Sequence, residues 1–232
     1  MPAHNEAGYL ETAVGEVHDG LSARGVEFEL LIVENGSTDG TPDIARRLAA
    51  DYAGVRVLSR SFANYGAALR EGLTASRGEF AVTFDVDYYE LGFVDQALAL
   101  LESGDDAPVM VVASKRAPGS QDDRPWPRRF VTAVFSWLLR AGFSLSVSDT
   151  HGMKAMRRAP VELLVRRCRF ASDLFDTELV IRAERAGFRL AELPARAQER
   201  RPSRTPIWRR VPRTLVGLVE LRITLWREGH SR

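Results

Sequence analysis

Short apolar runs alternate with amphipathic stretches through the first half of the chain, and turn-forming residues follow most of the runs. The runs predict buried strands, and the stretches between them repeat apolar positions every three or four residues, which predicts helices. The expected strands are 29–33, 55–58, 80–84 and 109–113, and the expected helices are 42–49, capped by Thr41, 65–75 and 93–101. This alternation predicts an α/β fold with a mainly parallel sheet and helices on both faces.

The second half has fewer strands and longer amphipathic stretches. We expect a loop at 118–127, helices at 128–143 and 173–186, and a strand at 189–193. The apolar side of helix 128–143 is expected to comprise Phe130, Val131, Val134, Phe135, Leu138 and Leu139. A last amphipathic helix is indicated by Trp208, Val211, Leu215, Leu218 and Val219, at spacings of three and four. We therefore divide the chain into a main domain, 1–200, and a basic amphipathic C-terminal segment, 201–232.

The charge of the chain is unevenly distributed. The whole chain has a net charge of +1, whereas 196–232 contains ten Arg and three Glu. Such a basic segment could bind RNA, but its apolar stripe better suits a helix lying on an anionic bilayer, and we expect no nucleic-acid partner. The chain has one cysteine, Cys168, and we see neither a signal peptide nor a membrane span. We expect a cytoplasmic protein, peripheral at the inner membrane face.

The motif Asp85-Val86-Asp87 follows an expected buried strand directly. Two carboxylates at positions i and i+2 can both reach a hard cation if the chain turns there, and Mg²⁺ or Mn²⁺ prefers such oxygen ligands. The alternative is a solvated acidic turn, because short motifs often arise by chance.

Three other segments precede this motif in a fixed order. Residues 2–6 read PAHNE, 33–41 read VENGSTDGT and 64–72 read NYGAALREG. Together with FDVD at 84–87, they resemble the family 2 glycosyltransferases, and more closely the dolichyl-phosphate mannose synthase and polyprenyl-phosphate glycosyltransferase branch. Three later segments are similar to that branch and favour a lipid-phosphate acceptor: SDTHGMK at 148–154, FDTEL at 175–179 and ERRPSR at 199–204.

The resemblance implies a GT-A fold and the inverting transfer of a hexose, mannose or glucose, from a GDP- or UDP-sugar to a polyprenyl (dolichyl-type) phosphate. The implied cofactor is Mg²⁺ or Mn²⁺, with Asp85 and Asp87 as metal ligands. The implied donor-binding residues are Pro2, Asn5, Glu6, Glu34, Asn35, Asn64, Gly66, Asp85 and Val86. The implied catalytic residues are Asp87, Lys115 and Arg200, and the acceptor phosphate is assigned to Lys115, Arg128, Arg129, Arg200 and Arg204. A phosphate acceptor is already a nucleophile at neutral pH, so it needs positioning rather than a general base.

The sequence also departs from the family pattern. Asn35 replaces an acid, so the nucleobase of the preferred donor could differ from that of the family. Alternatively, Glu34 and Asn35 could only shape their turn. Tyr89 stands where mannose synthases commonly have a metal-binding Gln, so either water fills that position or Glu90 substitutes. Family members usually have an apolar strand just before PAHNE, whereas here Met1 directly precedes Pro2, so either that strand is missing or the true start lies upstream.

Two alternatives keep this fold. The acceptor could be a soluble glycan or a small phosphorylated metabolite, or the protein could bind a sugar nucleotide without catalysis. His4 and His151 are interpreted as loop residues, because no nucleophile motif or metal-ligand spacing accompanies them.

Overall fold

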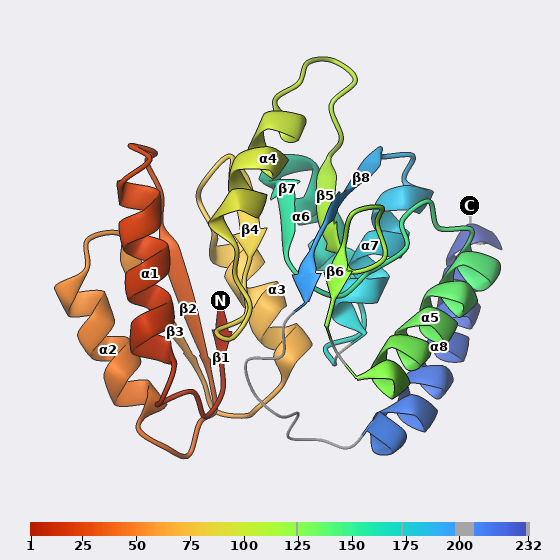
Figure 1. Cartoon of the computed structure of the whole chain (residues 1–232). Helices are drawn as coiled ribbons and strands as arrows, with labels where there is room; N and C mark the ends of the chain where they lie inside the picture. Colours follow the sequence, from red (N-terminus) through yellow and green to blue (C-terminus); the bar gives the residue numbers. More distant parts are fainter. Residues whose placement is uncertain (124, 173, 198–206, 231–232) are drawn as a thin grey trace.

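The computed structural model describes residues 1–123, 125–172, 174–197 and 207–230 (Figure 1). Two sheets form the body of the molecule. In Figure 1 the first sheet, with two of its helices, lies at one end, and two long helices lie side by side at the other.

The first sheet is parallel and has the strand order β1-β2-β3. Its strands are β1 (Pro2–Ala3), β2 (Leu30–Asn35) and β3 (Val55–Arg60), and the helices that connect and follow them are α1 (Leu10–Ser22), α2 (Thr41–Asp51) and α3 (Tyr65–Ala75). Every residue of β2 is buried, as expected for the central strand of a covered parallel sheet. The register pairs Ala3 with Glu34 and Asn35 with Arg60, so the loops after these strands meet at one edge.

The second sheet is mixed and has the order β4-β7-β5-β8. Its strands are β4 (Phe80–Thr83), β5 (Met110–Ser114), β7 (Lys154–Arg157) and β8 (Leu190–Pro194), and a small parallel pair is formed by β6 (Gln121–Asp122) and β9 (Arg196–Ala197). β7 runs antiparallel to both β4 and β5 and was not predicted, because Lys154 and Arg157 make it look like a surface segment. β5 and β8 are parallel. The prediction of a mainly parallel sheet nevertheless holds, since four of the six strand pairings in the described residues are parallel.

The remaining helices are α4 (Leu91–Leu101), α5 (Trp126–Phe143), α6 (Arg158–Arg167), α7 (Phe175–Arg185) and α8 (Ile207–His230). α3 has the predicted bounds, whereas α1 and α6 were not predicted. α1 packs on the core through Leu10, Val14 and Val17, a helical spacing that is visible in the sequence. α5 begins inside the stretch expected to be a loop, because Pro127 is at a position of the first turn where its missing N–H is not needed.

α8 is packed against the body rather than separate from it. Leu218, Leu221 and Leu225 are buried in the same core as α7. A methyl group at Gly217 would lie 2.1 Å from Cδ1 of Leu174, so the helix approaches closely. The guanidinium of Arg182 on α7 donates to the carboxylate of Glu228 over 2.8 Å and 3.2 Å. Hydrophobic packing and an ion pair thus hold α8 in place.

In the second half of the chain, the single cysteine, Cys168, is buried at the end of α6 beside α7. None of the helices in the described residues has the length and apolar content needed to cross a bilayer.

Candidate active site

The two predicted metal ligands lie in a tight turn at the end of β4. The backbone N–H of Asp85 donates to the carbonyl of Tyr88 over 3.1 Å, and the N–H of Tyr88 donates back over 3.2 Å. Val86, between the two acids, is buried in the first core. The turn is therefore anchored by Val86 and leaves the carboxyl groups of Asp85 and Asp87 half-buried.

Asp85 has an unusual environment for a carboxylate. Burial raises its pKa to about 6, and the nearby acids Asp176 and Asp87 act in the same direction. The hydroxyl of Tyr65, which donates to Oδ1 of Asp85 over 2.9 Å, and the ammonium of Lys154 oppose this rise. The ionised form of Asp85 is therefore less favoured than that of an exposed Asp, and a further positive charge nearby would stabilise it.

A buried ion pair lies close to this turn. Nζ of Lys154 donates to Oδ1 of Asp176 over 2.8 Å and to the carbonyl of Gly152 over 3.0 Å, and the two side chains are 1% and 4% exposed. The register pairs Lys154 with Thr83, the last residue of β4, which brings the pair next to Asp85. Neither residue was assigned to the site from the sequence. The signal was a Lys in an otherwise apolar run, Met153 to Met156.

The first two predicted donor segments are tied together by Asn5. Its backbone has a left-handed φ of 55°, which Asn tolerates better than most residues. Its N–H donates to Oγ of Ser37 over 3.0 Å, and its Oδ1 accepts from the N–H of Thr38 over 2.8 Å. Glu6 is buried, and its N–H donates to Oγ1 of Thr41 over 2.7 Å. Pro2 pairs with Val33 in the sheet.

The side chains of Glu34 and Asn35 also shape this edge of the sheet. The N–H of Ser37 donates to Oε1 of Glu34 over 2.6 Å, and the N–H of Asn64 donates to Oδ1 of Asn35 over 2.9 Å. Glu34 thus orders its own turn, whereas Asn35 holds the segment that leads into α3. Gly36, at a φ of 66°, leaves room for the chain at Phe62, whose carbonyl carbon would be 2.8 Å from an added Cβ.

The start of α3 connects these loops to the acidic turn. Asn64 caps α3 by accepting from the N–H of Ala67 over 3.2 Å, and Tyr65 then reaches Asp85. Gly66 packs so closely that a methyl group would lie 2.2 Å from the carbonyl oxygen of Ser172. The predicted donor and metal residues therefore converge on one edge, linked through Asn35, Asn64 and Tyr65.

Of the residues assigned to the acceptor phosphate, Lys115 lies beside the acidic turn. Its Nζ is 3.8 Å from Oδ2 of Asp149 and 5.9 Å from the centre of the Tyr88 ring. Arg129 lies exposed on α5, and no hydrogen bond or ion pair of its side chain is found in the described residues. Arg128 lies on α5, but its side chain is not described, and Arg200 and Arg204 lie outside the described residues.

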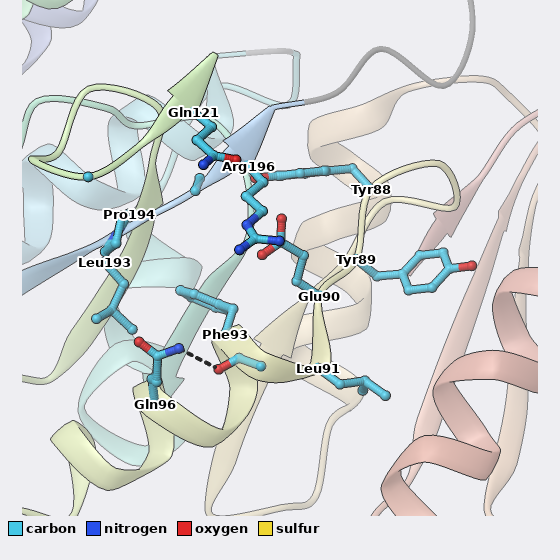
Figure 2. Close-up of a pocket in the computed structure, with 13 residues that line it drawn as sticks. Tyr88, Tyr89, Glu90, Leu91, Phe93, Gln96, Gln121, Leu193, Pro194 and Arg196 are labelled. Carbon is cyan, nitrogen blue, oxygen red and sulfur yellow. Dashed lines mark hydrogen bonds between the residues drawn. The ribbon is translucent and has the colours of Figure 1, made fainter. Parts of the chain in front are cut away.

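The side chains of Tyr89 and Glu90, which follow the acidic turn, point in different directions, as Figure 2 shows. The hydroxyl of Tyr89 donates to Oε2 of Glu16 on α1 over 2.7 Å, so the phenol is directed away from the turn. Glu90 points instead into a neighbouring cavity of about 630 Å³. Arg196 and Gln121 enter that cavity from the other side, and Phe93 forms part of its wall.

The loop 148–152 is held by acids that the sequence did not single out. Oε1 of Glu192 accepts from the N–H of Ser148 over 2.5 Å and from the N–H of Asp149 over 3.2 Å. Oδ1 of Asp149 in turn accepts from the N–H of His151 over 2.9 Å. Burial lowers the pKa of His151 below its usual value, although Asp176 and Asp149 oppose this. His151 is therefore a neutral part of the loop at physiological pH.

The chain was compared with known proteins. Residues 1–164 match the family described as Glycosyl transferase family 2. Glycosyltransferase AglD of Haloferax volcanii is 32% identical to this chain over 200 residues, which are 84% of this chain and 32% of AglD. The chain thus spans about a third of the length of that relative.

Solved structures share the fold. Mannosyl-3-phosphoglycerate synthase from Rubrobacter xylanophilus aligns over 100% of this chain and 74% of its own, with a TM-score of 0.70 and 18% identity. Glucosyl-3-phosphoglycerate synthase from Mycobacterium tuberculosis, crystallised with Mn²⁺, uridine diphosphate and phosphoglyceric acid, aligns over 95% of this chain and 76% of its own, with a TM-score of 0.66 and 22% identity. These likenesses confirm the expected GT-A type α/β fold.

Proposed function

Because this chain belongs to glycosyl transferase family 2, we propose that it transfers a hexose from a nucleotide sugar to a polyprenyl phosphate with Mg²⁺ or Mn²⁺ as cofactor. The observation that carries the proposal is a series of hydrogen bonds that runs from Asn5 through His4 and Asn35 to Asn64. The next residue along the chain, Tyr65, then donates to Asp85. Together these bonds join the loops assigned to the nucleoside with the carboxylates assigned to the metal.

The side chains at the acidic turn fit a divalent ion. In the described part of the chain no three His, Cys, Asp or Glu side chains are grouped to hold a metal, so the proposed site relies on two protein ligands, and we assign these to Asp85 and Asp87 as the resemblance implies. Mg²⁺ typically takes one or two carboxylates and completes its shell with substrate phosphates and water. The raised pKa of Asp85 supports the same assignment, because a bound cation favours its ionised form. The hydroxyl of Tyr89 is hydrogen-bonded to Glu16, so we assign the remaining coordination positions of the metal to the donor diphosphate and water.

The donor assignments come from the family resemblance, and the geometry of the loops supports them. Pro2, Asn5, Glu6, Glu34 and Asn35 are proposed to line the nucleoside end of the donor, and Asn64, Gly66 and Val86 the approach to the diphosphate. Asn35 uses its Oδ1 to accept from Asn64, which leaves its amide N–H groups to donate to a base or ribose oxygen. We therefore expect the preferred nucleobase to present a hydrogen-bond acceptor to Asn35.

The chemistry proposed for the acceptor requires positioning. A phosphate oxygen of the acceptor attacks the anomeric carbon while the bond from that carbon to the diphosphate breaks, and the bonding pair leaves with the nucleoside diphosphate. When bound, the divalent ion stabilises the charge that develops on this leaving group. Lys115 offers a positive charge beside the turn for the attacking phosphate, with Arg128, Arg129, Arg200 and Arg204 as further candidates. Direct displacement inverts the anomeric centre.

A second candidate acceptor is a small phosphorylated hydroxy compound. The cavity beside the turn favours it, because Glu90 could accept a proton from a hydroxyl group and Arg196 could bind an anionic group. The two structural relatives named above are a glucosyl-3-phosphoglycerate synthase and a mannosyl-3-phosphoglycerate synthase. A hydroxyl acceptor needs a general base, whereas a phosphate acceptor does not.

The test uses the purified chain with Mn²⁺ and radiolabelled GDP-mannose or UDP-glucose. Polyprenyl phosphate in detergent and 3-phosphoglycerate are offered separately, and Glu90→Gln is assayed in parallel with the wild type. We expect transfer to polyprenyl phosphate that Glu90→Gln leaves within about twofold and that EDTA abolishes. Transfer to 3-phosphoglycerate alone, lost in Glu90→Gln, would establish the second candidate. Nucleotide-sugar binding without transfer to either would favour a non-catalytic binder.

A further inference from the structure

α5 has an apolar face that points away from the protein. Leu139 and Ser136 are buried against the body, whereas Trp126, Phe130, Val134 and Trp137 are exposed on the opposite side. Trp126 and Trp137 are 74% and 66% exposed. Their spacing of four, four and three residues puts the four side chains on one stripe. The sequence had assigned Phe130 and Val134 to the same side as Leu139, so α5 is apolar on two faces.

α8 has the same construction. Its buried side packs on the core, and its outer side exposes five apolar residues: Leu215, Val216, Val219, Ile223 and Trp226. α5 and α8 lie side by side in Figure 1, and the guanidinium of Arg222 lies 5.8 Å from the centre of the Phe143 ring. We call the nine exposed residues of the two helices the apolar face. Exposed apolar residues that gather on two neighbouring helices usually mark an interaction site.

The charge around the apolar face is positive. α5 contains three Arg and no acidic residue, and α8 contains five Arg and two Glu. One of these acids, Glu228, is already paired with Arg182 and lies 3.3 Å from Arg169. Arg140, Arg222 and Arg227 are exposed. A second copy of the chain would bring an equally basic face against this one, so the charge favours an anionic partner.

The positions of the tryptophans indicate which kind of anionic partner the apolar face would contact. All four tryptophans of the chain lie on α5 or α8. Trp prefers the boundary between the hydrocarbon and the headgroups of a bilayer. A shallow cavity of about 400 Å³ runs beside α8 and is lined by Arg169, Arg227, one acid, Glu220, and the apolar side chains of Phe170 and Ile223. The two Arg outnumber the acid, so the lining suits an anionic headgroup beside an acyl chain. Neither helix can cross a bilayer, so contact would be in the plane of the surface.

We propose that the apolar face of α5 and α8 docks this protein onto the interface of an anionic phospholipid bilayer. The apolar stripes enter the boundary region, and the flanking Arg side chains contact lipid phosphates. This extends the proposed lipid acceptor by naming the surface that would bring the site to it. The surface can be tested with neither donor nor acceptor present.

The experiment measures sedimentation of the full chain with vesicles of phosphatidylcholine containing about one third phosphatidylglycerol. Trp126→Ser/Trp137→Ser removes the two most exposed residues of the α5 stripe, and Arg140→Gln/Arg222→Gln removes two flanking charges. Leu163→Ser is the matched control, because Leu163 is an equally exposed apolar residue on α6, outside the face. Point variants are preferred to removal of α8, since truncation would open the core at Leu221.

The wild type should bind the anionic vesicles, with a blue shift of Trp fluorescence, and binding should weaken as salt is raised above about 0.1 M. The double Trp variant should bind about tenfold more weakly, the double Arg variant should lose most of its preference for anionic lipid, and Leu163→Ser should bind as the wild type does. Equal thermal unfolding of all forms would show that the variants are folded. Two outcomes overturn the proposal: a wild type that ignores anionic vesicles, or a dimer in solution that the Trp substitutions dissociate. Neither depends on the outcome of the transferase assay.

Discussion

The hydroxyl of Tyr65, the first residue of α3, donates a hydrogen bond to Oδ1 of Asp85 at the end of β4, 20 positions along the chain. The bond orients one of the two carboxylates proposed to hold the metal, and it favours the ionised form of Asp85. Tyr65 is therefore a positioning residue whose role can be separated from the fold.

Replacement of Tyr65 by Phe should weaken metal binding. Without the hydroxyl, the pKa of Asp85 rises above its present value of about 6, and the carboxylate is free to turn. We expect an increase of about tenfold in the Mn²⁺ concentration needed for half-maximal activity, with a smaller change at pH 8.5 than at pH 6.5. Activity is measured against Mn²⁺ at both pH values. Tyr52→Phe, at the end of α2, where the ring packs against His18, is the control, and an equal loss there would argue against a specific role.

Asp85→Asn should stabilise the metal-free protein. The pKa of Asp85 is raised from 3.8 to about 6, so its contribution to stability is fully present below pH 3.8 and is lost as the pH rises through 6. Above pH 7 the amide avoids this cost, and we expect the free energy of unfolding to increase by about 1 to 2 kcal/mol, since partial exposure reduces the full effect. Urea unfolding at pH 5 and pH 8 with EDTA measures the difference.

The same substitution should abolish stabilisation by Mn²⁺ together with transfer. A bound ion needs the ionised carboxylate, so the wild type should lose Mn²⁺ affinity by up to about tenfold per pH unit below 6. An Asp85→Asn protein that kept full transfer activity in EDTA would contradict the metal assignment. Asp87→Asn is expected to lose transfer as well.

Loss of Lys154 should destabilise the protein strongly. Lys154→Met leaves the carboxylate of Asp176 buried without its cation, which typically costs about 3 to 5 kcal/mol. Lys154→Met/Asp176→Leu should recover most of the loss, because both charges are then absent. Urea unfolding of the two single variants and the double variant forms a double-mutant cycle. A double variant as unstable as Lys154→Met would show that packing, rather than charge, dominates at this position.

Gly66→Ala should be far more harmful than an alanine elsewhere in a helix. Its methyl group would lie 2.2 Å and 2.6 Å from the carbonyl oxygens of Ser172 and Ala171, and backbone atoms cannot move aside cheaply. We expect a loss of about 2 to 3 kcal/mol. Gly142→Ala on α5 meets nothing within 4 Å and should be neutral or slightly stabilising. Thermal unfolding of both variants tests the comparison.

The sequence predicted the local parts of this structure well. α3, β2 and the acidic turn came from apolar periodicity and turn residues, which depend on neighbours in the chain. β7 was missed because Lys154 is buried by a tertiary partner, Asp176, and its charge hides the strand pattern. Periodicity also could not tell which apolar face of α5 is buried, since both faces look alike until α8 and the sheets are in place.

Side-chain contacts between segments far apart in the chain could not be predicted from the sequence either. The bond of Tyr65 to Asp85 and that of Tyr89 to Glu16 depend on how α3 and α1 pack on the sheets. The order of the motifs indicated that the segments meet, without indicating which atoms touch.

The burial of Cys168 has a practical consequence. Burial raises the pKa of its thiol far above neutral, so almost no reactive thiolate is present in the folded protein. It is also the one cysteine of the chain. A cysteine introduced at an exposed position of α5 or α8 would then be the principal site for maleimide labels, and a nitroxide attached there could report its depth in a bilayer by paramagnetic relaxation.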